Sequence, residues 1–178
     1  MNNKKITIFP LILFFFVLYI FFFLLTSNRD PSELPSVLID KKIPVFTSKS
    51  LLNEKIFISS NEFNNGITLV NFFATWCKPC IDEHPYLKKL SKKKELKILG
   101  INYKDKPGKA IAWLEKLGNP YYNVLIDQDA LIGIDWGVYG IPETFIVNSD
   151  GIIKYRLVGP ITGKNYNAFN KKIEEIRD

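Results

Sequence analysis

The chain has 178 residues, of which 47% are hydrophobic, and a formal net charge of +6 at pH 7. This length allows one compact domain with its own core and argues against a second one. Lys4 and Lys5 precede every acidic residue, so the rest of the chain has 22 basic and 18 acidic residues and a net charge of +4. Such a small, scattered excess argues against nucleic-acid binding, which requires a basic stripe with interleaved aromatic residues.

An apolar segment without a charged residue occupies positions 6–25. As a helix, about 20 residues span about 30 Å, the thickness of the hydrocarbon core of a bilayer. A cleaved signal peptide is the alternative, but its apolar region is typically about 7–15 residues long. The residues after Leu25 also lack the small-x-small pattern of a cleavage site. We therefore predict a retained transmembrane anchor that contacts the lipid bilayer through residues 6–25.

The charges that flank this segment predict its orientation. Lys4 and Lys5 lie before it with no acidic residue nearby, which places the N-terminus in the cytoplasm and the following residues outside. Residues 28–42 are polar and contain prolines, as expected for a linker. The predicted organisation is a cytoplasmic N-terminus with an anchor over 1–27, a linker over 28–42 and a folded domain over 43–178.

The remainder of the chain predicts alternating strands and helices. Residues 67–73 form a nearly continuous apolar run, typical of a strand that is buried on both faces of a sheet. A helix to about residue 91 and a strand over 96–103 complete a βαβ unit with a right-handed crossover. Further on, we predict a helix over 110–117, a strand over 124–126, a hairpin of strands 143–148 and 152–158, and an amphipathic helix over 165–176.

The two cysteines of the chain, Cys77 and Cys80, lie at the predicted strand-to-helix turn. Zinc is disfavoured, because two thiolates and the single histidine cannot complete a structural site with four ligands. A c-type haem motif requires histidine directly after the second cysteine, where Ile81 stands. A structural disulfide stays open as an alternative, although closing so short a loop constrains the unfolded chain little. The pattern favours a redox-active pair that uses no metal and no other cofactor.

The position of the pair also predicts a division of labour. A cysteine at a helix N-terminus is stabilised as a thiolate by the helix dipole and by unpaired backbone N–H groups. Cys77 is expected there, as the exposed nucleophile. Cys80 lies one turn inward and is expected to be the resolving thiol that breaks the mixed disulfide.

Two segments resemble a known family. Residues 71–80, Asn-Phe-Phe-Ala-Thr-Trp-Cys-Lys-Pro-Cys, resemble the active-site segment of thioredoxin-like proteins. Residues 137–145, Gly-Val-Tyr-Gly-Ile-Pro-Glu-Thr-Phe, are similar to the cis-proline loop of the DsbE/CcmG thiol:disulfide interchange proteins of cytochrome c maturation. The resemblance covers about residues 35–178. It implies a thioredoxin-like α/β fold, with a central mixed β-sheet flanked by helices and preceded by one transmembrane helix.

The resemblance also implies a function and several site residues. Pro142 is expected to be a cis-proline that faces Cys77, and the neighbouring backbone at Ile141 to pair with an extended substrate. Trp76 is expected to shield the disulfide and to pack beside the site, with a role in the core alone as the alternative. The implied protein is a reductase of the bacterial inner membrane with its domain in the periplasm. Its implied target is apocytochrome c or another maturation thiol protein, and its electron donor a membrane thiol reductant. A general periplasmic reductase or oxidase, or a non-catalytic apocytochrome-binding module, remains an alternative.

Asn71 marks a departure from thioredoxins. They have a buried aspartate six residues before the first cysteine, which manages the proton of the resolving thiol, and an amide cannot take that proton. Glu83 lies one helical turn after Cys80, and Glu143 lies beside Pro142, so either carboxylate is a candidate for this role. His84, the only histidine, is interpreted as a packing or surface residue.

Overall fold

The computed structural model describes residues 4–26, 37–53, 55–63 and 66–177. The chain divides into two units, residues 1–31 and 32–178, which are described separately. Most of the predicted linker, residues 28–36, lies outside the described residues.

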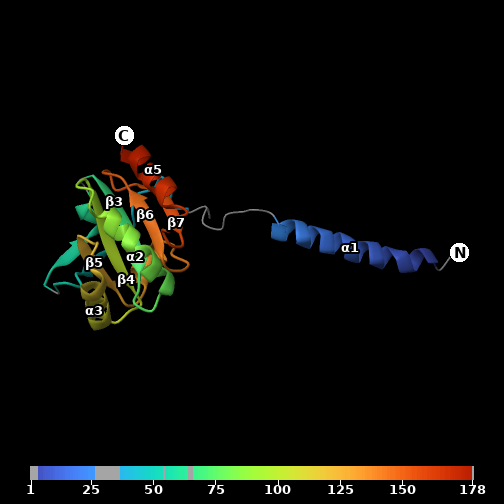
Figure 1. The fold of residues 1–178 in the computed structure, drawn as a ribbon, viewed down its shortest axis with the longest axis horizontal. Coiled ribbons are helices and arrows are strands. Elements are labelled where there is room, and N and C mark those ends of the chain that lie inside the picture. Colours follow the sequence, from blue (N-terminus) through green and yellow to red (C-terminus); the bar gives the residue numbers. More distant parts are fainter. Residues whose placement is uncertain (1–3, 27–36, 54, 64–65, 178) are drawn as a thin grey trace. The chain divides into compact units, whose positions relative to one another are not determined.

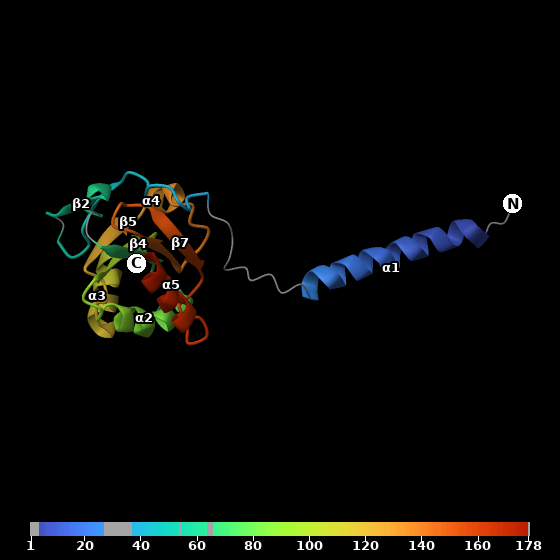
Figure 2. The same ribbon diagram turned by 90° about the horizontal axis from the view of Figure 1, so that it is seen from above.

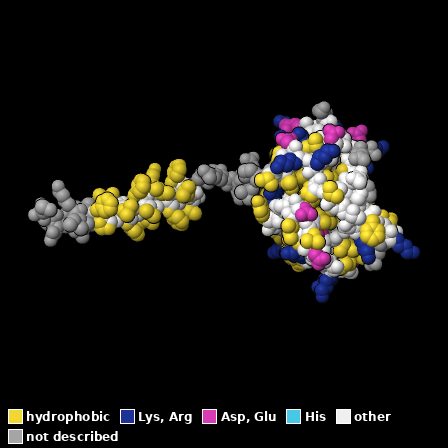
Figure 3. Space-filling model, turned by 180° about the vertical axis from the view of Figure 1, so that it is seen from behind, with side chains coloured by type: hydrophobic (Ala, Val, Ile, Leu, Met, Phe, Trp, Pro, Cys, Tyr) yellow, Lys and Arg dark blue, Asp and Glu magenta, His cyan; other side chains and the backbone are white. Residues whose placement is uncertain are grey.

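The described residues of the N-terminal unit form one helix, α1 (Lys4–Thr26). Its segment Phe9–Thr26 has a mean hydropathy of 2.7, and none of it is buried within the protein. Apolar side chains cover the described part of this helix (Figure 3). The helix is therefore long and apolar enough to cross a membrane, in agreement with the predicted span.

The C-terminal unit is built on a five-stranded mixed sheet of order β5-β4-β3-β6-β7 (Figure 1). Strand β3 pairs in parallel with β4 and antiparallel with β6; β5 is parallel to β4, and β7 is antiparallel to β6. The predicted βαβ unit and the predicted hairpin are both confirmed. The strands are β3 (Ile67–Phe73), β4 (Leu96–Tyr103), β5 (Asn123–Asp127), β6 (Glu143–Val147) and β7 (Ile153–Val158).

Helices cover the two faces of the sheet unequally (Figure 2). One face is covered by α2 (Lys78–Leu90), α3 (Pro107–Leu117) and α5 (Tyr166–Arg177). The other is covered by the short helix α4 (Leu131–Asp135) and by apolar side chains of the segment before β3, at Ile43, Phe46, Ile58 and Phe63. This segment contains the hairpin β1 (Thr47–Lys49) and β2 (Phe57–Ser59) and the 3-10 helix η2 (Ser60–Glu62), and its Ser50 bridges to Leu125 at the edge of β5. The three long helices were predicted, and α3 begins earlier than expected because Pro107 suits the first helical turn.

Strand β3 is the centre of the sheet, and all seven of its residues are buried. Successive side chains of a strand point to opposite faces. Leu69 and Phe73 therefore pack in the cluster under α2, α3 and α5, whereas Val70 and Phe72 pack in the cluster under α4. The same alternation turns Asn71 toward α2.

The folded unit includes residues that the sequence assigned to the linker. The backbone N–H of Asp40 donates to the carbonyl of Ile153, and the N–H of Ile153 donates to the carbonyl of Lys41. Leu38 and Ile39 pack against the cluster on the α4 side. Residues 38–42 thus form an added edge contact beside β7.

Candidate active site

Cys77 and Cys80 form a disulfide at the junction of β3 and α2, with an S–S distance of 2.05 Å. Cys77 is the N-cap residue of α2, and its Sγ accepts a hydrogen bond of 3.2 Å from the backbone N–H of Cys80. Pro79 lies in the first turn, where its missing N–H costs no helical hydrogen bond. Both cysteines are buried, Cys80 more completely, at 1% exposure against 4% for Cys77. The helix-terminal position expected of Cys77 is confirmed, whereas its expected exposure is wrong, because the disulfide packs into the core cluster under α2.

The loop before β6 approaches the disulfide. The Ile141–Pro142 peptide bond is cis. The carbonyl oxygen of Ile141 lies 3.5 Å from Sγ of Cys77. The loop of residues 137–142, the proline loop, therefore places the Ile141 carbonyl directly beside Cys77, the more exposed of the two cysteines.

A buried ion pair holds this loop. Nη2 of Arg156 lies 2.6 Å from Oε2 of Glu143, and both side chains are almost completely buried. Oε1 of Glu143 accepts from the backbone N–H groups of Tyr139 and Gly140 at 3.0 and 3.2 Å. Arg156 also donates to the carbonyl of Gly137 at 3.0 Å. Both oxygens of Glu143 are thus committed to holding the loop.

Glu83 lies on the buried side of α2, one turn after Cys80, and has no exposed surface. Its Oε1 accepts a hydrogen bond of 2.9 Å from Nδ2 of Asn71, and its Oε2 accepts one of 3.2 Å from the backbone N–H of Ile161. Burial raises the pKa of Glu83 from 4.5 to about 8, and the two hydrogen bonds only partly oppose that rise. The helical spacing therefore places a carboxyl group of high proton affinity on the same helix face as Cys80.

Asn71 connects Glu83 to two residues that sequence reasoning missed. Its Nδ2 also donates to Oγ1 of Thr144 at 3.0 Å, and its Oδ1 accepts from the Tyr121 hydroxyl at 2.8 Å. Burial, and then the negative charge of Glu83, raise the pKa of Tyr121 well above its usual value. Strand alternation could have placed Thr144 on the α2 face of the sheet, because Thr144 lies two positions before the apolar Ile146 in β6. No such pattern could have placed Tyr121, because Tyr121 belongs to a loop.

Trp76, the residue before Cys77, is 59% exposed. Its indole Nε1 donates to the backbone carbonyl of Lys104 at 3.1 Å. Thr75 is anchored beside it, with the backbone N–H and the hydroxyl donating to the carboxylate of Asp105. The turn that leads into the cysteines is therefore fixed to the end of β4, and Trp76 offers an apolar surface next to the disulfide.

His84 is a packing residue, as interpreted from the sequence. It is buried, its Nε2 lies 2.7 Å from the carbonyl oxygen of Gly118, and its ring contacts Trp113 edge-on. Burial lowers the pKa of His84. Within the described ranges of the chain, no group of three His, Cys, Asp or Glu side chains is placed to hold a metal ion.

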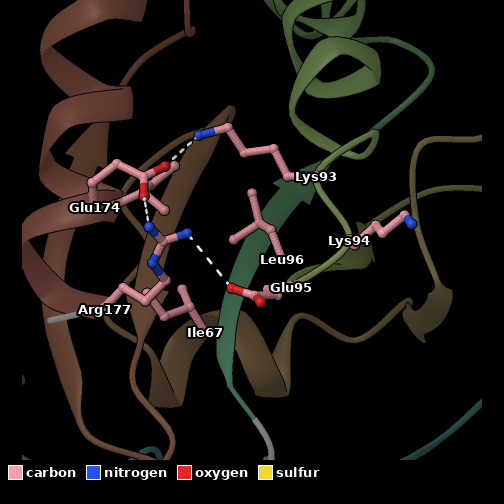
Figure 4. Close-up of a pocket in the computed structure, with 8 residues that line it drawn as sticks. Ile67, Lys93, Lys94, Glu95, Leu96, Glu174 and Arg177 are labelled. Carbon is pink, nitrogen blue, oxygen red and sulfur yellow. Dashed lines mark hydrogen bonds and ion pairs between the residues drawn. The ribbon is translucent and has the colours of Figure 1, made fainter.

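A cleft of about 370 Å³ lies at the opposite end of the sheet (Figure 4). It is bordered by Ile67 and Leu96, the first residues of β3 and β4, whereas the cysteines follow the last residue of β3. Seven residues of strand span about 23 Å. Arg177 reaches Glu174 and Glu95 across this cleft, and Lys93 also binds Glu174. The cleft is therefore separate from the redox site, and its ion pairs attach α5 to the start of β4.

Comparison with known proteins agrees with this geometry. A family model described as Redoxin matches residues 39–171. The thiol:disulfide interchange protein DsbE of Vibrio cholerae serotype O1 is 41% identical over 167 residues, which cover 92% of this chain and 90% of that protein. The protein of the same name from Escherichia coli K12 is 42% identical over 177 residues, covering 97% and 95%.

The fold is also similar to that of a solved structure of a DsbE protein. The crystal structure of a putative thiol:disulfide interchange protein DsbE from Chlorobium tepidum is similar with a TM-score of 0.71 and 20% identity, over 80% of this chain and all of that chain. The fold is thus thioredoxin-like, as predicted. With its sequence relatives and its disulfide at a helix N-terminus, the chain belongs to the DsbE family of thiol:disulfide interchange proteins and is a thiol:disulfide oxidoreductase.

Proposed function

We propose that the protein is a membrane-anchored periplasmic reductase, which keeps the haem-binding cysteines of apocytochrome c, or of a maturation thiol protein, reduced. The observation on which this rests most is the position of Cys77, at the N-terminus of α2 and beside the Ile141 carbonyl. The choice of target rests on the resemblance of the proline loop to that of the DsbE/CcmG proteins. The proposed membrane anchor rests on the length and apolar character of helix α1.

In the first step, the Cys77 thiolate attacks one sulfur of the target disulfide. A mixed disulfide forms between Cys77 and the target, and the second target sulfur leaves as a thiolate. The dipole of α2 and the N–H of Cys80 stabilise the attacking thiolate. The Ile141 backbone and the exposed Trp76 ring hold the target segment next to Cys77.

In the second step, Cys80 becomes the nucleophile. Its thiol transfers a proton to the Glu83 carboxylate, its sulfur bonds to Sγ of Cys77, and the target leaves as a second thiolate. Two electrons have then passed from the cysteine pair to the target, and a membrane thiol reductant restores the dithiol. Burial raises the pKa of Glu83 to about 8, which makes its carboxylate a stronger base than an exposed one.

Glu143, the second candidate from the sequence, is assigned a positioning role. Its two oxygens accept from the proline loop and from Arg156, and its strand parity turns it away from α2. No metal and no cofactor besides the cysteine pair takes part in the proposed reaction.

The test is trapping with a Cys80→Ala variant of the full chain in its native membrane. This variant forms the mixed disulfide and cannot resolve it, so targets stay attached to Cys77. Mass spectrometry of the trapped proteins is expected to return proteins with Cys-x-x-Cys-His motifs or a thiol protein that acts on them. A Cys77→Ala variant is the matched control and should trap nothing.

The outcome also separates the alternatives. A broad set of unrelated periplasmic proteins would indicate a general reductase, and a measured reduction potential near that of a strong oxidant would indicate an oxidase. The proposed anchor is tested independently with an exported reporter fused after residue 40, which should be active. A mature N-terminus near residue 28 in a soluble fraction would contradict it.

A further inference from the structure

Four buried polar side chains from four segments meet around Asn71, on the face of the sheet covered by α2. Asn71 comes from β3, Glu83 from α2, Thr144 from β6, and Tyr121 from the loop before β5. Each of them is less than 10% exposed. Buried polar groups require hydrogen-bond partners, so the protonation state of one member constrains all the others.

The hydrogen bonds of Asn71 form a chain with a fixed direction. Its amide nitrogen donates to Glu83 Oε1 and Thr144 Oγ1, and its amide oxygen accepts from the Tyr121 hydroxyl. The two hydroxyls can either donate or accept, whereas an ionised carboxylate only accepts. Glu83 is therefore the group that decides which end of the amide faces it, and the observed arrangement is the one that suits an ionised Glu83.

When Glu83 is protonated, its carboxyl group can donate a hydrogen bond, so the Asn71 NH2 group is no longer the partner that suits it. Oε2 already accepts from the N–H of Ile161, so the new hydrogen on Oε1 meets the NH2 group of Asn71. A half-turn of the amide exchanges its nitrogen and oxygen, which have nearly the same size, about a broad torsion. The Asn71 oxygen then accepts from Glu83 and Thr144, and its nitrogen donates to the Tyr121 oxygen.

We propose that the Asn71 amide reverses whenever Glu83 gains or loses a proton, and that Asn71 positions Glu83 for both halves of its proton transfer with Cys80. Tyr121 and Thr144 serve as the two adaptable partners of that reversal. The inference rests on the role proposed above for Glu83. It gives a physical reason for an amide at position 71: an aspartate would add a second buried negative charge, and an apolar residue would leave the ionised carboxylate with one donor fewer.

The neighbourhood of Glu83 makes this reversal measurable in the oxidised protein. Cys77 and Cys80 are joined in the disulfide and do not titrate. Tyr121 has a pKa well above its usual value. His84, the next residue of α2, reaches the Gly118 carbonyl instead, and Glu143 of β6 lies on the other face of the sheet. A transition near pH 8 in this cluster therefore belongs to Glu83.

The first test is nuclear magnetic resonance on the oxidised full chain in detergent micelles, labelled with 15N at asparagine and 13C at the glutamate carboxyl groups. We expect the Glu83 carboxyl and the Asn71 amide resonances to titrate with one common midpoint. Below it, the Asn71 amide hydrogens should show contacts to the Tyr121 ring, and above it to Glu83. Amide contacts that stay the same across the Glu83 transition would overturn the proposal.

A Glu83→Gln variant is the control, because it has no proton to exchange at this position. Its Asn71 contacts should be independent of pH between 5 and 9. Persistence of the transition in this variant would assign it to another group and overturn the proposal. Neither result affects trapping by Cys80→Ala, so failure here is distinguishable from failure of the proposed function.

Kinetics supply a second test. Asn71→Leu removes the donor to the carboxylate at similar volume, so the pH midpoint for resolution of the mixed disulfide should rise. A rise of one unit lowers the ionised fraction of Glu83, and the resolution rate at pH 7, about tenfold. The first attack by Cys77 should keep its wild-type pH profile. An unchanged midpoint for resolution would exclude a positioning role for Asn71.

Discussion

Arg156 and Glu143 form a buried ion pair, with Nη2 2.6 Å from Oε2, and the pair lies behind the loop that ends in Pro142. Arg156 also stacks its guanidinium against the ring of Tyr139, at 4.7 Å from the ring centre. Tyr139 is 76% exposed, so one buried cation supports both the backbone of the loop and its most exposed ring.

Removal of one partner of this pair should destabilise the protein strongly. Arg156→Met leaves the Glu143 carboxylate buried and unpaired, which costs about 3–5 kcal/mol of unfolding free energy. In Glu143→Gln/Arg156→Met the unpaired charge is absent, so the loss should be smaller than the sum of the single losses. Chemical denaturation of the four proteins in detergent measures this coupling. Additive losses would show that the pair contributes no mutual stabilisation.

The roles of the two glutamates separate in kinetics. Glu83→Gln keeps the size of the side chain and removes the base, so resolution of the mixed disulfide should slow about 10 to 100-fold while the first attack stays within a few-fold of wild type. Glu143→Gln should leave the resolution rate within a few-fold. Rapid-quench measurement on a disulfide peptide resolves the two steps. Slow resolution in Glu143→Gln alone would transfer the role to the proline loop, and fast resolution in both would leave it to solvent.

The stability of the oxidised protein should decrease with rising pH because of Glu83. Its pKa rises from 4.5 to about 8 on burial, so between these values the folded state binds more protons than the unfolded state. The contribution of Glu83 to the free energy of unfolding is therefore largest below about pH 4.5 and is lost as the pH approaches 8. Relative to Glu83→Gln, the wild type should lose on the order of 3 kcal/mol between pH 5 and 8. Parallel denaturation curves across this range would contradict the raised pKa.

Gly100 of β4 allows the Tyr121 ring to approach the sheet. A Cβ at this position would lie 3.0 Å from ring atoms of both Phe73 and Tyr121, which stack at 4.9 Å in the core. Gly100→Ala should therefore cost about 1–3 kcal/mol of stability. It should also displace the Tyr121 hydroxyl from Asn71. Gly108→Ala is the matched control, because a Cβ at that position meets nothing within 4 Å and alanine favours the helix. Chemical denaturation measures the stability of both variants. Equal stabilities of the two variants would refute the packing argument.

Much of the fold follows from local patterns in the sequence. The apolar run of residues 67–73 predicts β3 with its observed bounds, because a strand buried on both faces needs no polar alternation. The turn at residues 149–151 predicts the β6–β7 hairpin. Strands β1 and β2 and helix α4 escaped prediction, because three to five residues are too few to establish a period. They are stabilised by packing against the sheet, at Ile58 and Ile132.

The sequence alone indicated the chemistry of this protein: two cysteines with Cys-x-x-Cys spacing at a predicted strand-to-helix junction favour a redox pair over a structural disulfide, and helical spacing places Glu83 on the side of Cys80. Only the tertiary structure shows how the environments of the two candidate carboxylates differ, and the proposed role of Glu83 rests on that difference. Arg156, thirteen positions beyond Glu143, neutralises that side chain, whereas Glu83 is buried with only neutral donors, Asn71 and the backbone of Ile161. The proton affinity of a carboxyl group depends on the charges and the solvent around it, and folding brings those together from distant parts of the chain.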